Sequence, residues 1–143
     1  MFSRRISAEI TMAAPPARVW AALMDFPAHA AWNPFIRGIA GEAALGEELT
    51  VILSPGGVRS YVIRPRVTRL VAEQRLAWRS RLFLPGLFTG AHDLALTAHA
   101  GGTRFTHTAG FSGILLPMLR GMLAETEQGL ARMNTALRQR VEA

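Results

Sequence analysis

The sequence predicts an α+β fold in which a curved antiparallel β-sheet wraps around a long C-terminal α-helix. Two observations support this prediction. From residue 46 to residue 112 the apolar residues recur with a period of two, which is typical of strands with one buried face. From Leu115 onward the period changes to that of an amphipathic helix, over about 26 residues. A helix with one apolar stripe is best buried against the sheet that precedes it.

Before residue 46 we expect one strand, two short helices and a second short strand. Residues 2–12 alternate weakly between polar and apolar side chains, which favours a strand. Pro15-Pro16 suits the start of a helix, where a missing N–H costs little, and apolar residues then follow at helical spacing up to Phe26. A further helical turn is expected over 28–32, and a short strand over 36–39.

Five strands are expected next, separated by turns rich in glycine and proline. Pro65 lies within the second of them, which indicates an edge position or a bulge, because proline has no N–H for the sheet. The expected strands cover residues 46–53, 59–70, 75–82, 88–99 and 103–112.

The last two expected strands form a hairpin whose register can be predicted. A two-residue loop at Gly101-Gly102 would pair Ala100 with Thr103. Counting back along both strands, Ala98 then faces Phe105, and His92 faces Phe111. This register gives the two strands a common apolar face, as a buried sheet requires.

The C-terminal stripe is regular, and two glycines interrupt the helix that carries it. Gly121 and Gly129 each weaken a helix by up to about 1 kcal/mol relative to alanine. Such glycines allow close approach to a sheet or leave room for a ligand. The stripe comprises Leu115, Leu119, Met122, Thr126, Leu130, Met133 and Leu137.

Composition indicates a soluble, cytoplasmic protein with one domain over residues 1–143. Half of the residues are hydrophobic, yet no apolar run is long enough to span a membrane, and no signal peptide is recognisable. There is no cysteine, which excludes disulfides and thiolate chemistry. The net charge of +6 comes from dispersed arginines without any lysine, so no specific nucleic-acid partner is expected. Glycine-rich phosphate loops and Gly-x-Ser-x-Gly elbows are absent, and we expect no cofactor.

Several motifs resemble the SRPBCC superfamily of helix-grip proteins, which includes START lipid-transfer domains and bacterial polyketide cyclases. The motifs are Val-Trp-Ala-Ala-Leu at 19–23, Trp-Asn-Pro-Phe at 32–35, Leu-Pro-Gly-Leu-Phe at 84–88 with Gly-Ala-His at 90–92, Gly-Thr-Arg-Phe at 102–105 with Phe-Ser-Gly at 111–113, and Met-Asn at 133–134.

The resemblance covers nearly the whole chain and implies a helix-grip fold with a ligand cavity between the sheet and the C-terminal helix. It does not select one function, because the superfamily includes carriers, cyclases, hydrolases and regulators. Similar proteins often carry a glutamate two residues before the Phe-Ser-Gly phenylalanine. Here that position is Ala109, which argues against a role that requires this carboxylate.

His92 is the main candidate for a functional residue. On the apolar face, an imidazole can bind a ligand by a hydrogen bond or act as an acid or base. The alternative is a buried histidine that has only a structural role. His107 is expected on the same face, four residues away in the predicted register. That offset is about 13 Å at about 3.3 Å per residue, so we expect no shared metal ion.

Aromatic and apolar residues complete the expected ligand-binding set, in which Tyr61 would present a hydroxyl to the ligand. The alternative for the aromatic residues is an ordinary core. The expected set is Tyr61, Ile63, Trp78, His92, Phe105, His107, Phe111, Met122, Thr126 and Leu130.

Three functional hypotheses follow. The first is a binder of an apolar small molecule such as a lipid, polyketide or quinone. The second is a cyclase or dehydratase that uses His92 as acid or base. The third is a protein-interaction module, with a possible homodimer. The interaction surface would then be the very apolar segment 82–88 or the N-terminal strand. For the segment 82–88, a dimer contact, a lid, a membrane contact and packing on the C-terminal helix are the alternatives.

Overall fold

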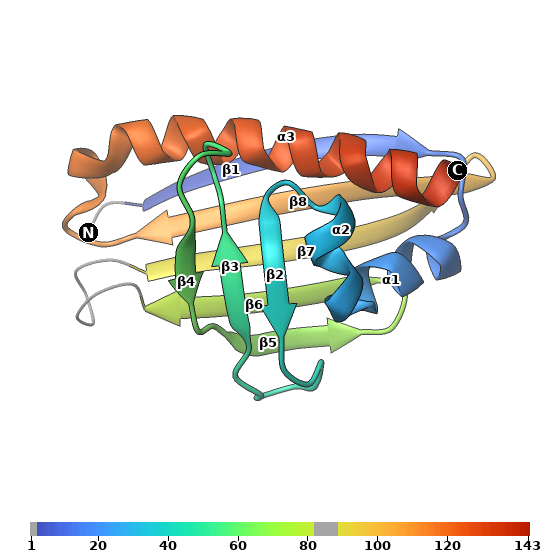
Figure 1. Ribbon diagram of the computed structural model, residues 1–143, viewed down its shortest axis with the longest axis horizontal. Coiled ribbons are helices and arrows are strands. Elements are labelled where there is room, and N and C mark those ends of the chain that lie inside the picture. Colours follow the sequence, from blue (N-terminus) through green and yellow to red (C-terminus); the bar gives the residue numbers. More distant parts are fainter. Residues whose placement is uncertain (1–2, 82–88) are drawn as a thin grey trace.

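The computed structural model describes residues 3–81 and 89–143 and confirms the predicted fold class. Two antiparallel sheets and a long helix, α3 (Arg120–Glu142), enclose the core. Figure 1 shows α3 lying lengthwise along the larger sheet, while the strands of the smaller sheet run across those of the larger one. The apolar segment 82–88 lies outside the described residues, so its predicted role as lid or contact stays a prediction.

The larger sheet has five strands in the order β1-β8-β7-β6-β5. Its inner face is apolar because alternate residues of its strands point into the core; β8, for example, alternates regularly between buried and partly exposed positions. The strands are β1 (Ser3–Met12), β5 (Arg66–Val71), β6 (Arg75–Arg81), β7 (Thr89–His99) and β8 (Gly102–Ser112).

The smaller sheet contains β2 (Ile36–Ala40), β3 (Thr50–Leu53) and β4 (Tyr61–Ile63). The expected single strand over 59–70 is wrong, because the chain leaves the smaller sheet after β4 and enters the larger one at β5. Pro65, which has no N–H for a ladder, lies at this crossing.

Backbone hydrogen bonds on either side of Pro65 connect the two sheets. The N–H of Leu49 donates to the carbonyl of Pro65 at 2.8 Å, and the N–H of Val67 donates to the carbonyl of Glu47 at 2.9 Å. The segment just before β3 is therefore hydrogen-bonded to the start of β5, beside the point where the chain crosses from one sheet to the other.

The hairpin of β7 and β8 has a register two residues away from the predicted one. Ala98 pairs with Thr103, and the loop is Ala100-Gly101 instead of Gly101-Gly102. Both loop residues have positive φ, 47° at Ala100 and 83° at Gly101, as a type I′ hairpin turn requires. A slip of two residues keeps every side chain on its predicted face but changes all its cross-strand neighbours. Ala98, expected inside, is exposed at the end of the hairpin.

Helix α1 (Pro16–Met24) begins at the predicted proline and leads through two short helical segments, η1 (Phe26–Ala28) and α2 (His29–Trp32). The helical region ends at Asn33, whose buried side chain binds the backbone that follows. Its Oδ1 accepts hydrogen bonds from the N–H groups of Phe35 at 3.0 Å and Ile36 at 2.8 Å. Its Nδ2 donates to Nδ1 of His29 at 3.1 Å, and Nε2–H of His29 donates to the carbonyl of Leu23 at 2.8 Å.

The C-terminal helix consists of a 3-10 turn, η2 (Leu116–Leu119), followed by α3. The predicted stripe is buried from Thr126 to Leu137 and partly buried at its N-terminal end. The turn between β3 and β4 packs on the middle of α3, where a guanidinium N–H of Arg132 donates to the carbonyl of Pro55. Among the described residues, no helix is long and apolar enough to cross a bilayer.

Candidate ligand cavity

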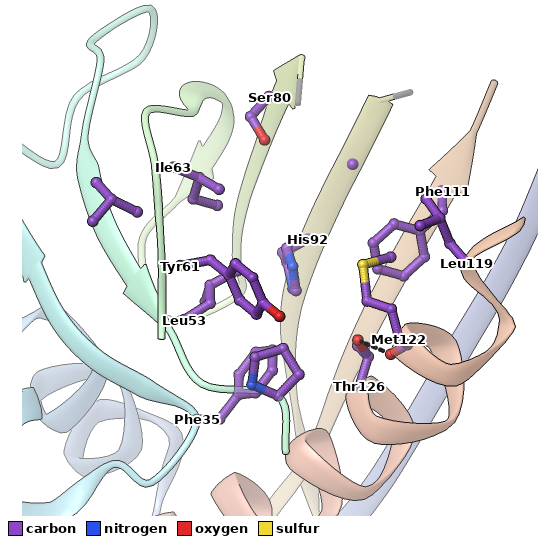
Figure 2. Close-up of a pocket in the computed structure, with 13 residues that line it drawn as sticks. Phe35, Leu53, Tyr61, Ile63, Ser80, His92, Phe111, Leu119, Met122 and Thr126 are labelled. Atoms are coloured by element: carbon purple, nitrogen blue, oxygen red, sulfur yellow. Dashed lines mark hydrogen bonds between the residues drawn. The ribbon is translucent and has the colours of Figure 1, made fainter. Parts of the chain in front are cut away.

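A cavity of about 340 Å³ lies where the larger sheet, the smaller sheet and α3 meet. Figure 2 shows the side chains around it. Its volume is at the lower end of the range for small-molecule pockets, and its wall is mainly apolar, as is usual for them. The described residues that line it are Phe35, Leu53, Pro55, Tyr61, Val62, Ile63, Ser80, Gly90, His92, Phe111, Leu119, Met122 and Thr126.

Small residues on the larger sheet create the space. Ser80, Gly90 and Phe111 form one row across β6, β7 and β8, because Ser80 pairs with Gly90 and Gly90 pairs with Phe111. Two of these three positions have little or no side chain, and both line the cavity. The neighbouring row of Trp78, His92 and Ala109 is buried and forms the inner boundary. A step from large to small side chains along the strands therefore opens a hollow beside a packed core.

His92 and His107 form a hydrogen-bonded pair at this boundary, with 3.1 Å between Nδ1 of His92 and Nε2 of His107. In the observed register His92 pairs with Ala109, so His107 is its diagonal neighbour on β8. The methyl side chain of Ala109 leaves the space between the two imidazoles free. His92 lines the cavity, whereas His107 is fully buried behind it.

Burial keeps both imidazoles neutral at physiological pH. It lowers the pKa of His92 from 6.5 to about 4. Burial also lowers the pKa of His107 well below its usual value, and repulsion from His92 lowers it further. Aromatic rings surround the pair: the centroid of Phe35 lies 5.8 Å from that of His92 and 5.7 Å from that of His107, and Trp78 lies 5.8 Å from His92. Among the described residues, no acidic side chain contributes to the pKa shift of either histidine, so none stabilises a positive charge on these rings.

The predicted separation of about 13 Å between the two histidines is wrong because the predicted register was wrong. The two rings touch through a hydrogen bond, which occupies one nitrogen of each. Within residues 3–81 and 89–143, no group of three or more potential metal ligands occurs.

Three hydroxyl groups add polarity to the cavity wall. Figure 2 shows the hydroxyl of Tyr61 directed into the cavity, although the residue is about half exposed at its edge. Thr126 donates its hydroxyl to the carbonyl of Met122 at 2.8 Å, one turn earlier in α3, so its oxygen faces a ligand only as an acceptor. Ser80 supplies the third hydroxyl.

Six of the ten predicted binding residues line this cavity, namely Tyr61, Ile63, His92, Phe111, Met122 and Thr126. The other four, Trp78, Phe105, His107 and Leu130, are buried in the core without lining it. Whether any of them binds a ligand stays a prediction. Gly129, considered as possible room for a ligand, instead allows close packing: a Cβ there would lie 2.6 Å from the ring of Phe35.

Sequence reasoning missed part of the wall as binding residues, above all Phe35, Pro55, Val62, Gly90 and Leu119. Phe35 belongs to the Trp-Asn-Pro-Phe motif, and Gly90 is the first residue of Gly-Ala-His, so both had a signal in the sequence. Pro55 and Val62 had none, because they reach the cavity only through the packing of the smaller sheet against α3.

Comparison with known proteins agrees with this architecture. Residues 3–142 match the family described as polyketide cyclase / dehydrase and lipid transport, and the chain belongs to this family. The family supports a role in ligand binding or in cyclase-type chemistry, with an apolar small molecule as partner. No curated protein matches the chain.

Solved structures with this fold include an aromatase/cyclase, Zhui, from Streptomyces sp. R1128, with a TM-score of 0.79 and 19% identity over 99% of this chain and 94% of that one. A START superfamily protein from Mycobacterium smegmatis has a TM-score of 0.72 and 20% identity over 96% and 97% of the two chains. Protein MLL2253 from Mesorhizobium loti has a TM-score of 0.78 and 19% identity over 97% of both chains. At such identities the likeness shows the fold alone.

Proposed function

We propose that this protein binds an apolar small molecule of the lipid, polyketide or quinone type in the cavity between the sheets and α3. The observation that supports this most is the step in side-chain size on the larger sheet, where Ser80 and Gly90 leave a hollow beside Phe111. A core meant only for stability would fill such a hollow, since an interior void forfeits dispersion contacts. The mainly apolar wall selects an apolar ligand, and few polar groups remain to orient it.

The cyclase-type alternative would use His92 as an acid or base. An efficient general base has a pKa near the working pH, whereas burial lowers the pKa of His92 to about 4. Neutral His92 is a weak acid and a weak base, and no carboxylate lines the cavity among the described residues. These observations favour binding without acid–base catalysis.

The test uses the neutral fluorescent probe N-phenyl-1-naphthylamine, together with native mass spectrometry of the purified protein. We expect saturable binding with enhanced fluorescence, and a retained ligand mass if the expression host makes a suitable molecule. A wild-type protein that does not bind the probe and is always isolated empty would contradict the proposal.

A matched pair of variants locates the binding site. Thr126→Phe places a ring in the cavity, whereas Thr135→Phe places the same ring on the exposed side of α3. Both threonines donate their hydroxyl to the carbonyl four residues earlier, at 2.8 Å and 3.2 Å, so both variants lose an equivalent hydrogen bond. Only Thr126→Phe should abolish probe binding. Equal binding by the two variants would show that the probe sits elsewhere.

A further inference from the structure

We propose that His107 fixes the proton of His92 on Nε2, so that the cavity offers a hydrogen-bond donor and selects apolar molecules with a carbonyl oxygen. This inference rests on the proposed function of the cavity and names the ligand class. It follows from the hydrogen bond between the two histidines and from the burial of the remaining nitrogen of His107.

Two neutral arrangements fit the 3.1 Å contact between Nδ1 of His92 and Nε2 of His107. Either His92 donates and His107 accepts, or the reverse. Each neutral imidazole carries one proton, so the direction of this bond also decides which of the outer nitrogens, Nδ1 of His107 and Nε2 of His92, carries the other proton.

The surroundings of His107 select one arrangement. Its Nδ1 is buried and has no hydrogen-bonding partner among the described residues. If His92 donated, Nδ1 of His107 would carry a proton and leave a buried N–H without an acceptor. If His107 donates, its Nδ1 is an unprotonated acceptor, and an unused acceptor is the less rare defect in folded proteins. His107 therefore holds its proton on Nε2 and donates it to His92.

His92 then accepts at Nδ1 and carries its own proton on Nε2. Its ring lines the cavity, as Figure 2 shows, and Nε2 is not among the buried nitrogens that lack a partner. Among the described residues, the side-chain hydrogen bond of His92 is the one to His107, and it uses Nδ1, so Nε2 is left for a ligand. A carbonyl oxygen of a ligand, which only accepts, would satisfy it, whereas a group that can only donate, such as an ammonium, would meet an N–H. Because His107 does not line the cavity and is hydrogen-bonded to His92, it acts on a ligand only as a positioning residue.

The first measurement reads the protons directly, by two-bond ¹H–¹⁵N correlation NMR of the histidine-labelled wild-type protein at pH 7. The pattern expected for both His92 and His107 is a protonated Nε2 and an unprotonated Nδ1. Protonation of His92 at Nδ1 would overturn the assignment whether or not any ligand binds.

The second measurement compares fluorenone with fluorene, two molecules of nearly equal shape that differ by one carbonyl. Both are titrated as competitors of the fluorescent probe. Loss of one neutral hydrogen bond changes an affinity by about threefold to tenfold. We therefore expect the ratio of fluorenone to fluorene affinity to fall by this factor from the wild type to His92→Leu. Using the ratio removes the difference in hydration between the two compounds.

The outcomes separate the two proposals. If neither the fluorescent probe nor either compound binds the wild type, the proposed function fails. If both bind and His92→Leu leaves the ratio unchanged, the cavity is an apolar binding site but the donor assignment is wrong. If His92→Leu does not fold, the NMR spectrum of the wild type and that of the variant His107→Leu still test the tautomer assignment. The imidazole of His92 in His107→Leu should lose the single-tautomer pattern, and an unaltered pattern would show that His107 does not position it.

Discussion

The ring of Phe35 packs directly on the bare backbone of Gly129. A Cβ at Gly129 would lie 2.6 Å from Cδ1 of Phe35 and 2.9 Å from the carbonyl oxygen of Pro55, closer than real contacts allow. This contact holds the chain between α2 and β2, and the turn after β3, against the middle of α3. Because Phe35 also lines the cavity and touches both buried histidines, Gly129 sets the position of the cavity wall.

Gly129→Ala should therefore destabilise the protein, although alanine is the better helix former. Overpacking a buried site costs about 1–3 kcal/mol, which exceeds the helix-propensity gain of up to about 1 kcal/mol. Urea denaturation measures the net loss. Gly121→Ala in the same helix is the control, because a Cβ there meets no atom within 4 Å. It should stabilise by up to about 1 kcal/mol, and an equal gain from both variants would contradict the packing argument.

Asn33→Ala should lower the free energy of unfolding by about 2 kcal/mol or more. The substitution leaves the N–H groups of Phe35 and Ile36 without their acceptor and removes the donor to His29. Each buried group left unsatisfied costs about 1–3 kcal/mol. Asn33→Asp keeps the acceptor for both N–H groups and should recover part of the loss. If alanine and aspartate were equally harmful in thermal denaturation, the two N–H bonds would not be the cause.

Acid should destabilise the protein through its buried histidines. An unfolded histidine binds a proton below about pH 6.5, whereas folded His92 resists it until about pH 4. The unfolded state thus binds more protons between these values, and stability falls as the pH falls. A difference of 6.5 minus 4 corresponds to about 3 kcal/mol from His92. His107 acts in the same direction, as does His29, whose pKa burial also lowers.

The double variant His92→Leu/His107→Leu checks this prediction. Replacing both partners of a buried hydrogen bond by apolar groups is nearly neutral at pH 7, so the variant should fold. Its stability should fall less steeply than that of the wild type between pH 6.5 and pH 4. Parallel denaturation curves across this range would assign the acid sensitivity to other groups.

Removal of residues 115–143 should leave a molten or insoluble chain. The deletion exposes the inner face of the larger sheet, including the fully buried Phe105 and Leu94. It also removes Glu142, which accepts a hydrogen bond from the N–H of Ala13 at 2.8 Å and ties the end of α3 to the end of β1. Circular dichroism and differential scanning calorimetry would detect the loss of a cooperative transition. A truncated chain that still unfolds cooperatively would contradict the role of α3 in the core.

Periodicity predicted most elements and their buried faces, because burial of one face leaves a direct trace in the order of apolar residues. It could not predict the register of the last hairpin, since a slip of two residues leaves both faces unchanged. The type I′ turn at Ala100 and Gly101 decides it, and alanine is an unusual residue for a positive φ. The change of sheet at Pro65 was likewise hidden, because proline in a strand signals an irregularity without giving its kind.

The candidate site was predicted in its chemistry more than in its geometry. Six of the ten expected residues line the cavity, because alternation placed them on the inner face. The contact of His92 with His107 depends on the register and could not be foreseen. Leu119 was assigned to the helix stripe, but nothing in a stripe tells a core position from a cavity wall.

The cavity wall comes from three separate parts of the chain: the smaller sheet, the larger sheet and the C-terminal helix. No one part forms the cavity alone, so an unfolded chain has no binding site. A molecule that fills the cavity would bind the native state exclusively and shift the folding equilibrium by mass action. Once the free ligand concentration exceeds the Kd, each further tenfold increase adds about 1.4 kcal/mol to the free energy of unfolding. The melting temperature of this protein is therefore itself a detector, by which its natural ligand can be sought among unlabelled candidates.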